Sequence, residues 1–238
     1  MHSKSTGLVG NGKWGKIIQK KISSISKLHF IANSKSKYLN KLDKIDWIFI
    51  ATPDHTHFNI VNKCIKKKVN IFCEKPLTKT YIESLKLFQR ARKNKIFLYV
   101  DDIQSFLKKK VKIKKYNYIT RQKKSFGNPK DLLFRFAYHD FYYLYEKVKN
   151  DKISNIKIIN IKDCLEFKID FEKKTFHFYY SLNSEKRIHS FNSINLLTKK
   201  DILSKMIKDV LNEKVDFKNN KNKSLFANKL IDKIIKKI

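Results

Sequence analysis

The sequence predicts an α/β protein in which a Rossmann-like parallel sheet is followed by a second α+β domain built on a mainly antiparallel sheet. In the first hundred residues, short apolar runs alternate with segments of helical periodicity, as in βαβ units. Four of the five glycines fall within residues 7–15, where the first apolar run ends. After about residue 106, apolar and polar residues alternate, which is typical of antiparallel strands with one covered face. We therefore place a shortened first domain at residues 1–106 and a reduced second domain at residues 107–238.

The elements of the first domain follow from these runs in chain order. The run at 46–52 (DWIFIAT) is nearly all apolar, as expected for a strand buried on both faces of a parallel sheet. The link before it is short and polar, so this domain is expected to lack part of the usual Rossmann sheet. Strands are predicted at 6–10, 27–34, 46–52, 69–75 and 95–102, and helices at 13–25, 57–68 and 81–94.

The second domain is expected to begin with a solvent-facing strand at 111–120 and a helix in the second half of residues 131–150. The run KNNKNK (218–223) has the composition of a solvated loop. Further strands are predicted at 155–163, 165–172, 174–182 and 186–192 as an antiparallel meander, and terminal helices at 201–212 and 224–238.

The charge balance limits the classes of partner. The net charge is +33, from 54 Lys and Arg residues against 21 Asp and Glu residues, and only five of the 54 are Arg. Base recognition and bidentate phosphate binding favour Arg, so the composition argues against a specific nucleic-acid partner. The excess of lysine is expected to draw anionic small molecules toward a cleft.

The chain also shows no sign of secretion or of a membrane span. No apolar run approaches the ~20 residues of a membrane helix, and the start is too short and polar for a signal peptide. The cysteines Cys64, Cys73 and Cys164 are odd in number and scattered, which argues against a disulfide framework and a metal site. We expect a cytoplasmic protein with no membrane partner and no metal.

The segment GNGKWG (10–15) matches G-x-G-x-x-G between a predicted strand and a predicted helix. In this context Gly10 allows a tight turn, Gly12 lets a pyrophosphate approach the backbone, and Gly15 lets helix and strand pack closely. Asn11, Lys13 and Trp14 complete the expected cofactor-binding loop, with the phosphates at the helix N-terminus. The alternative is a glycine-rich turn with a structural role only.

The end of the second strand bears on the choice of dinucleotide. An acidic residue there normally binds the ribose 2′-hydroxyl, whereas this chain has Asn33, Ser34 and Lys35. Ser and Lys can receive a 2′-phosphate, so NADP is favoured over NAD. The alternative is that these lysines only follow the general composition.

Two further motifs, ATPDHTH (51–57) and CEKP (73–76), each follow a predicted strand. Together with GLVGNGKWG and YHDFYYL (138–144), they give a sequence that resembles the Gfo/Idh/MocA family of NAD(P)-dependent oxidoreductases. The resemblance covers the first half almost continuously and the second half more loosely. It implies hydride transfer between the nicotinamide and a carbinol carbon of a sugar or nucleotide-sugar.

The resemblance also implies roles for the residues of these motifs. Lys75 would be the catalytic lysine, with Lys75–Pro76 a candidate cis bond, and Glu74 would contact the cofactor ribose. The alternative for Lys75 is a solvated strand end. Residues expected along the nicotinamide side of the cofactor are Ala51, Thr52, Pro53 and His57.

In the second half, His139 resembles the acid–base histidine of the family's substrate domain, although it could also be a core histidine. Asp140 is expected to support His139 or contact substrate. Arg135 stands where sugar-acting members often have an aspartate, which favours an anionic substrate. The resemblance gives no role to Asp101 or Asp102.

Two questions stay open at this level. The chain could be an active sugar-type dehydrogenase, or a non-catalytic dinucleotide-binding sensor or partner subunit with a degenerate substrate domain. Family members commonly pair through the open face of the second sheet, which would make a homo-oligomer. The residues that could supply this face, or could instead cover the helices, are Phe167, Ile169, Phe176, Phe178 and Tyr180.

Overall fold

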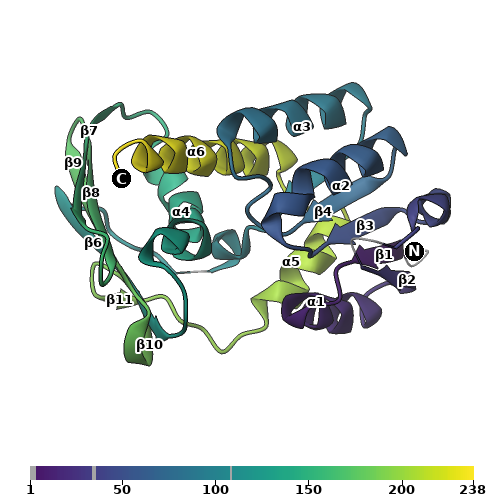
Figure 1. Ribbon diagram of the computed structural model, residues 1–238, viewed down its shortest axis with the longest axis horizontal. Helices are drawn as coiled ribbons and strands as arrows, with labels where there is room; N and C mark the ends of the chain where they lie inside the picture. Colours follow the sequence, from purple (N-terminus) through teal and green to yellow (C-terminus); the bar gives the residue numbers. More distant parts are fainter. Residues whose placement is uncertain (1–3, 34–35, 108) are drawn as a thin grey trace. The chain divides into compact units, whose positions relative to one another are not determined.

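The computed structural model describes residues 4–33, 36–107 and 109–238 (Figure 1). The chain divides into two compact units, residues 1–103 with 201–228 and residues 104–200 with 229–238. The sequence placed everything after residue 106 in the second domain, whereas residues 201–228 group with the first unit. The segment contacts the first unit through the helix at 202–211, which packs with the helix at 13–23, and through Asn220, which bonds to Val100.

The first unit is built on a five-stranded parallel sheet with the order β2-β1-β3-β4-β5. The chain leaves β2 and returns on the other side of β1 through a short 3-10 helix, η1 (Leu39–Lys44). The order of the sheet therefore reverses between β1 and β3, and ligands of such sheets bind at the carboxyl ends of the strands at this point. The strands are β1 (Ser5–Val9), β2 (Lys27–Ala32), β3 (Trp47–Ile50), β4 (Asn70–Cys73) and β5 (Leu98–Val100).

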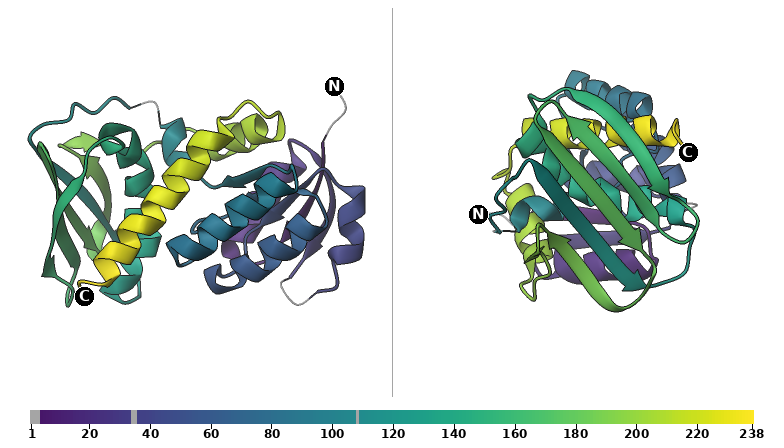
Figure 2. Two further views of the ribbon diagram at one scale, coloured as in Figure 1. Left: turned by 90° about the horizontal axis from the view of Figure 1, so that it is seen from above. Right: turned by 90° about the vertical axis from the view of Figure 1, so that its left-hand side faces the viewer.

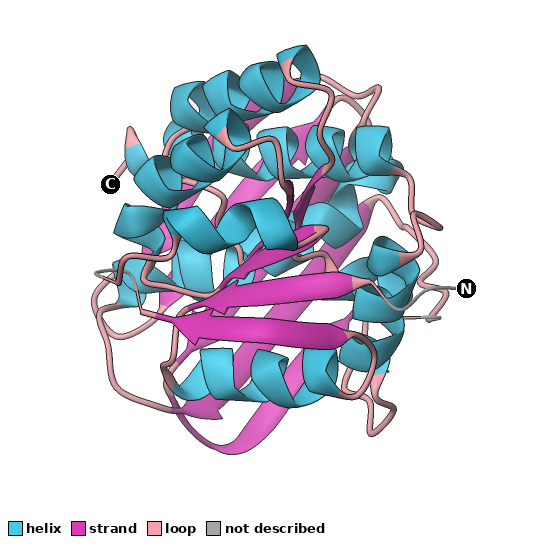
Figure 3. Cartoon of the chain, turned by 90° about the vertical axis from the view of Figure 1, so that its right-hand side faces the viewer, coloured by secondary structure: helices cyan, strands magenta, loops and turns pink. Residues whose placement is uncertain are grey.

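Helices cover the parallel sheet, as Figure 3 shows. α1 packs with α5, and α2 packs with α3. α1 presents Gly15, Ile18 and Ile22 to the interior, which is the helical spacing expected from its sequence. The helices are α1 (Lys13–Ser23), α2 (Asp54–Lys66), α3 (Tyr81–Lys93), α5 (Ile202–Leu211) and α6 (Phe217–Ile235).

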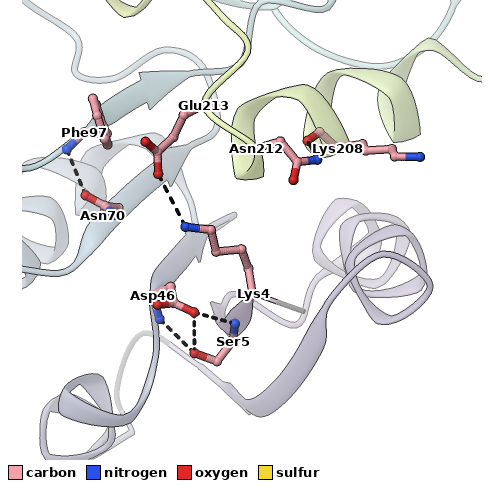
Figure 4. Close-up of polar contacts among 8 residues, drawn as sticks. All are labelled: Lys4, Ser5, Asp46, Asn70, Phe97, Lys208, Asn212 and Glu213. Carbon is pink, nitrogen blue, oxygen red and sulfur yellow. Dashed lines mark hydrogen bonds and ion pairs between the residues drawn. The ribbon is translucent and has the colours of Figure 1, made fainter. Parts of the chain in front are cut away.

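The amino ends of the strands are held by polar contacts of a structural kind (Figure 4). The Asp46 carboxylate accepts hydrogen bonds from the backbone N–H and hydroxyl of Ser5, at 2.7 and 2.8 Å. Lys4 pairs with Glu213 at 3.4 Å, and the Phe97 N–H donates to Asn70 at 3.0 Å. These contacts fix β1 to β3 and β4 to β5. Among the residues drawn in Figure 4, we therefore see structural contacts and no candidate catalytic group at the amino edge of the sheet.

The prediction of a solvated loop at residues 218–223 is wrong, because this run belongs to α6. Asn220 is 3% exposed, and its amide exchanges hydrogen bonds of 2.9 and 2.8 Å with the N–H and C=O of Val100. Lys223 is also buried and pairs with Asp102 at 3.2 Å. The polar side chains of this run therefore satisfy backbone groups and a carboxylate at the end of β5.

The second unit contains a mixed six-stranded sheet with the order β11-β10-β6-β9-β8-β7, seen face-on in the right-hand view of Figure 2. The pair β6–β9 is parallel and the others are antiparallel, which confirms the predicted fold class. β6 starts five residues later than the strand expected at 111 and lies between β9 and β10, so the meander is interrupted. The strands are β6 (Tyr116–Lys124), β7 (Ile153–Asn160), β8 (Leu165–Phe171), β9 (Lys174–Ser181), β10 (Asn183–Phe191) and β11 (Ile194–Asn195).

A run of helical turns packs on this sheet, and it consists of η3 (Pro129–Asp131), the π-helix η4 (Leu133–Ala137) and α4 (Tyr138–Val148). A further 3-10 helix, η2 (Ile103–Phe106), precedes the sheet. The Phe141 ring on α4 meets the rings of Phe167 and Phe178 edge-on, at 6.3 and 5.5 Å between centroids. All five residues considered above for an open sheet face are fully buried within this unit. They cover the helices, and the idea that they form an exposed pairing face is wrong.

Within the described part of the chain, none of the helices combines the length and the hydropathy that a membrane span requires.

Candidate functional site

The carboxyl edge of the first sheet carries most of the residues that the sequence singled out. Backbone hydrogen bonds of 2.8–2.9 Å extend the ladder one residue beyond the strand ends. They place four residues in a row along this edge: Gly10, Ala51, Glu74 and Asp101. Three of the four belong to the predicted motifs, and Asp101 is the fourth member that no motif predicted.

The glycine loop has the backbone that its motif predicts. Gly10 has φ +123°, and a Cβ at this position would lie 2.2 Å from the Ala51 carbonyl oxygen. A Cβ on Gly15 would lie 2.2 Å from the Gly10 carbonyl oxygen, whereas a Cβ on Gly12 would meet no atom within 4 Å. Gly10 and Gly15 are therefore required by the fold, and Gly12 leaves open space above the turn.

The start of α1 is suited to an anion. Gly12 is the N-cap, no side chain caps the helix, and the first turn has no acidic residue. Asn11, Lys13 and Trp14 are exposed there. Free backbone N–H groups and the positive end of the helix dipole favour a phosphate at this position.

The residues expected to select the dinucleotide are only partly described. Asn33 is exposed at the end of β2, and its N–H donates to the Ser36 hydroxyl at 3.2 Å. Ser34 and Lys35 lie outside the described residues, so the preference for NADP stays a prediction.

His57 links the two motif loops. Its Nδ1 lies 2.8 Å from the Pro76 carbonyl oxygen and its Nε2 lies 2.9 Å from the Thr52 carbonyl oxygen. The ring is 1% exposed, and burial lowers its pKa although both carbonyl contacts and Asp54 act in the opposite direction. A neutral imidazole donates through one nitrogen only, so one of the two contacts is a hydrogen bond at neutral pH.

The loops on either side of His57 are ordered by their own contacts. The Thr56 hydroxyl donates to the Thr52 hydroxyl at 2.7 Å, and Pro53 caps α2. The Lys75–Pro76 bond is cis, as the family resemblance led us to expect. Lys75 is half-buried directly after β4.

Glu74 and Asp101 form a buried carboxyl pair. Cys73 and Val100 are register partners in the parallel ladder, so Glu74 and Asp101 are the next residues of two neighbouring strands. They are 7% and 1% exposed, and their side chains hydrogen-bond to each other. Two ionised carboxylates can only accept hydrogen bonds, so this contact requires a proton on one of them.

Burial of both carboxyl groups favours the form of the pair that keeps a proton. Burial raises the pKa of Asp101 to about 6, with Asp102 adding to the rise and Lys75 opposing it. The pKa of Glu74 is also raised, mainly by burial and by the charge of Asp101, against a hydrogen bond with Trp14 and the charge of Lys75. Asp102 is paired with Lys223, and Lys75 is the cation that acts on both members of the Glu74–Asp101 pair.

We expect this pair to make stability depend on pH. The folded chain holds the Asp101 proton up to about pH 6, whereas an unfolded Asp releases it near 3.8, so stability falls as pH rises through this interval. Asp101→Asn removes the titration and should gain up to about 3 kcal/mol over the wild type at neutral pH, with little gain near pH 4. Urea unfolding at both pH values measures it, and an equal difference at the two pH values would contradict this origin.

In the second unit, His139 is half-buried in the first turn of α4, and the neighbouring Asp140 carboxylate is held by the sheet. Arg121 approaches Asp140 Oδ1 at 2.9 Å, and His189 Nε2 lies 2.9 Å from the same oxygen. The Tyr180 hydroxyl donates to Oδ2 at 3.0 Å. The carboxylate is therefore used within the unit to fasten α4 to β6, β9 and β10.

Arg135 lies in the π-helical turn η4 that precedes His139. Its Nη1 donates to the Phe126 carbonyl at 2.8 Å and its Nη2 donates to the Ser125 hydroxyl at 2.9 Å. These bonds hold the turn between β6 and η3 against η4. The sequence did not predict this structural role of Arg135.

The first sheet and its edge match a known family. A family model described as an oxidoreductase family with an NAD-binding Rossmann fold, GFO_IDH_MocA, matches residues 17–102. Residues 17–102 are therefore similar to the Gfo/Idh/MocA oxidoreductase family. The match confirms the resemblance read from the motifs, and it begins just after the glycine loop.

Oxidoreductases are also found among the similar sequences and structures. An uncharacterized oxidoreductase of Escherichia coli (strain K12), YgjR, is 35% identical over 57 residues, which are 24% of this chain and 17% of that relative. The match thus spans less than a fifth of the relative's length.

Two solved structures share the fold at low identity. The UDP-N-acetylglucosamine 3-dehydrogenase GnnA from Acidithiobacillus ferrooxidans has a TM-score of 0.78 at 16% identity, over 95% of this chain and 96% of that one. The WlbA (WbpB) dehydrogenase from Thermus thermophilus, in complex with NAD and UDP-GlcNAcA, has a TM-score of 0.75 at 12% identity, over 96% and 94%.

Two sets of residues at these sites were not predicted from the sequence. Asp101 could have been found, because it follows its strand as Glu74 follows the preceding one and parallel strands end at a common edge. The partners of Asp140 could not, since they depend on a register between β6, β9 and β10 that the sequence does not show. Within the described residues, no group of three or more His, Cys, Asp or Glu side chains forms a metal-type cluster.

Proposed function

We propose that this chain is an NAD(P)-dependent oxidoreductase that transfers a hydride between the nicotinamide and a carbinol carbon of a sugar or nucleotide-sugar. The observation that carries the proposal is the glycine loop at the reversal point of the sheet, where Gly12 leaves open space at an uncapped helix start. The match of residues 17–102 to the oxidoreductase family model supports it. The substrate class rests on the names of GnnA and WlbA and on the excess positive charge.

The residues at the sheet edge fit a dinucleotide. The N–H groups at the start of α1 would hold the pyrophosphate, since the N-cap Gly12 makes no side-chain cap hydrogen bond. Glu74 Oε1 is buried and has no hydrogen-bond partner among the described residues, so it can accept a ribose hydroxyl. When bound, the nicotinamide supplies the hydride chemistry. We propose NADP over NAD, from the lack of an acidic residue in the segment after β2.

Lys75 is the proposed proton donor and acceptor for the reacting oxygen. It is half-buried beside a pair of carboxyl groups, whose charge stabilises the ammonium form. His57 would help to keep Lys75 in place, since its buried ring lies between the carbonyl oxygens of Pro76 and Thr52 and bonds to one of them. Its near-complete burial supports this positioning role over direct contact with the cofactor.

His139 is the proposed acid–base residue of the second unit, since imidazole is the side chain whose chemistry suits proton transfer near neutrality. Asp140 would act through His139 by fixing the first turn of α4. Arg135 is proposed to favour an anionic substrate through its positive charge, while its guanidinium bonds to the turn at 125–127.

Two alanine substitutions test the nucleotide site. Gly12→Ala should cost at most about 1 kcal/mol of stability, because the added Cβ meets no protein atom, but should weaken NADH binding by at least about tenfold. Gly10→Ala should unfold the loop or the unit, because its φ and the Ala51 carbonyl both exclude a Cβ. Calorimetric NADH titration and urea unfolding give the two quantities. Unchanged NADH affinity in Gly12→Ala would contradict the proposed pyrophosphate position.

A substrate screen separates an active enzyme from a binding protein. NAD⁺ and NADP⁺ are incubated with UDP-N-acetylglucosamine, other nucleotide-sugars and free sugars, and formation of the reduced nicotinamide is followed by absorbance. Turnover of at least one substrate supports the dehydrogenase. Tight NADH binding without turnover of any of them would favour the non-catalytic sensor or partner subunit.

A further inference from the structure

We propose that Asp101 is a positioning residue for Glu74: the two carboxyl groups share one proton, and this proton holds Glu74 with Oε1 open to a hydroxyl of the bound dinucleotide. The inference rests on the proposed function, because it names how that site keeps its acceptor in place. It concerns a residue outside the motifs that define the site.

The geometry of the two strands brings the carboxyl groups together. Glu74 and Asp101 follow register partners of a parallel ladder, whose strands lie about 4.8 Å apart, and their side chains are hydrogen-bonded. The Ile103 N–H donates to Asp101 Oδ1 at 3.1 Å, which fixes the orientation of Asp101. The mutual hydrogen bond raises the pKa of Glu74 and lowers that of Asp101, so Glu74 carries the proton and donates to the fixed Asp101 carboxylate. Glu74 then cannot rotate without loss of that bond.

The remaining oxygen of Glu74 points to a ligand. Glu74 is 7% exposed, and Oε1 has no hydrogen-bond partner among the residues that the structure describes. A buried carboxylate oxygen without a donor carries a large free-energy cost, which a ligand hydroxyl would remove. Trp14, at the start of α1, also hydrogen-bonds to Glu74 and connects the pair to the glycine loop.

The charged groups around the pair set the direction of the effect. Lys75 faces both carboxyl groups, Asp102 faces Asp101 and is itself paired with Lys223, and the Cys73 thiol faces Glu74. Tyr99 on β5 faces Asp101, Asp102 and Asp209 and stays protonated, because its pKa is raised well above the usual value.

Loss of the shared proton has two consequences, and both lower the affinity for the dinucleotide. It puts two negative charges at neighbouring strand positions, which separates the carboxylates and releases Glu74 from its orientation. It also adds a negative charge close to the site of an anionic dinucleotide. Affinity should therefore fall as pH rises through the titration of the pair.

The test measures NADH binding between about pH 5 and pH 8. NADH is the probe because its reduced ring is uncharged. In the wild type, affinity should fall as pH rises through the loss of the shared proton, whose holder Glu74 has a raised pKa, by up to about tenfold per pH unit, the limit for one proton. In Asp101→Asn the amide N–H replaces the shared proton, so affinity should stay within about threefold of the wild-type value at low pH and show no step. In Asp101→Ala affinity should be lower by about tenfold or more at low pH.

A second measurement needs no cofactor. The chain has two tryptophans, and the indole N–H of Trp14 reports on Glu74, while the buried Trp47 serves as an internal reference. In ¹⁵N-labelled wild type, the Trp14 signal should titrate with the pair, and its midpoint should move down by about one pH unit or more in Asp101→Asn. Asp209→Asn is the matched control, since Asp209 pairs with Lys205 and should leave the midpoint unchanged.

The outcomes separate this inference from the proposed function. NADH affinity with the same pH profile in all three proteins, or a Trp14 midpoint that Asp101→Asn does not move, overturns the role of Asp101 and leaves the dinucleotide site standing. Absence of NADH binding in the wild type rejects the proposed function, and the Trp14 titration still decides whether the pair shares a proton.

Discussion

Asp140→Ala should destabilise the second unit by about 3–5 kcal/mol. The substitution leaves the Arg121 guanidinium without its buried counter-ion and removes the acceptor of Tyr180 and His189. Arg121 and Asp140 have side chains only 11% and 4% exposed, so water cannot replace the lost contacts. Burial would raise the pKa of Asp140, but Arg121 and His189 outweigh it and lower the pKa, which favours the ionised carboxylate.

The matched control is Glu185→Ala in the same sheet. Glu185 pairs with Lys124 on the surface, where both side chains are about three-quarters exposed, and its loss should cost no more than about 0.5 kcal/mol. Both tryptophans lie in the first unit, so unfolding of the second unit is followed by circular dichroism and tyrosine fluorescence in urea. Equal midpoints for the two variants would show that the buried network contributes no more than a surface pair.

The same network also sets how stability responds to acid. The lowered pKa of Asp140 means that its contribution is fully present above the pKa of an unfolded Asp, near 3.9, and is lost as pH falls through the folded value. Burial lowers the pKa of His189, so its neutral form is favoured in the folded chain and protonation also costs stability. Both groups thus act in the same direction, and acid should loosen the attachment of α4.

Local patterns were enough to predict the first sheet. The run DWIFIAT became β3, whose four residues are all buried, and the glycine loop adopted the positive φ that its motif implies. These features depend on neighbours in the sequence. The second sheet was predicted in type but not in order, because the insertion of β6 between β9 and β10 is a pairing of distant segments.

Polar residues with distant partners were the main source of error. The run KNNKNK is hydrophilic, and only its contacts with β5 explain why Asn220 and Lys223 are buried in a helix. For a related reason the sequence did not show the three partners of Asp140, since they lie on strands that come later or earlier in the chain. In both cases the composition predicts exposure, and a tertiary hydrogen bond or ion pair decides burial.

Lys75→Met should lower turnover of a sugar substrate by about 10²–10⁴-fold, the range expected for loss of a positioned acid–base group. NADH affinity should stay within about threefold of the wild type, since loss of a cation makes the neighbouring carboxyl pair hold its proton more tightly. Lys75→Arg should not restore turnover, because a guanidinium does not release its proton near neutral pH. Steady-state kinetics with a nucleotide-sugar identified by the screen, and calorimetry with NADH, give the two quantities.

Lys79→Met is the control for a lost lysine in the same loop. Lys79 is exposed and makes a 3.6 Å surface pair with Asp54, so its loss should leave both turnover and NADH affinity unchanged. A fall in NADH affinity as large as the fall in turnover in Lys75→Met would identify Lys75 as a binding residue. Turnover within about threefold of the wild type would instead remove it from the reaction, and proton transfer would then have to come from the carboxyl pair or from His139. Comparison of the changes in kcat and in NADH affinity therefore decides whether Lys75 takes part in proton transfer or in cofactor binding.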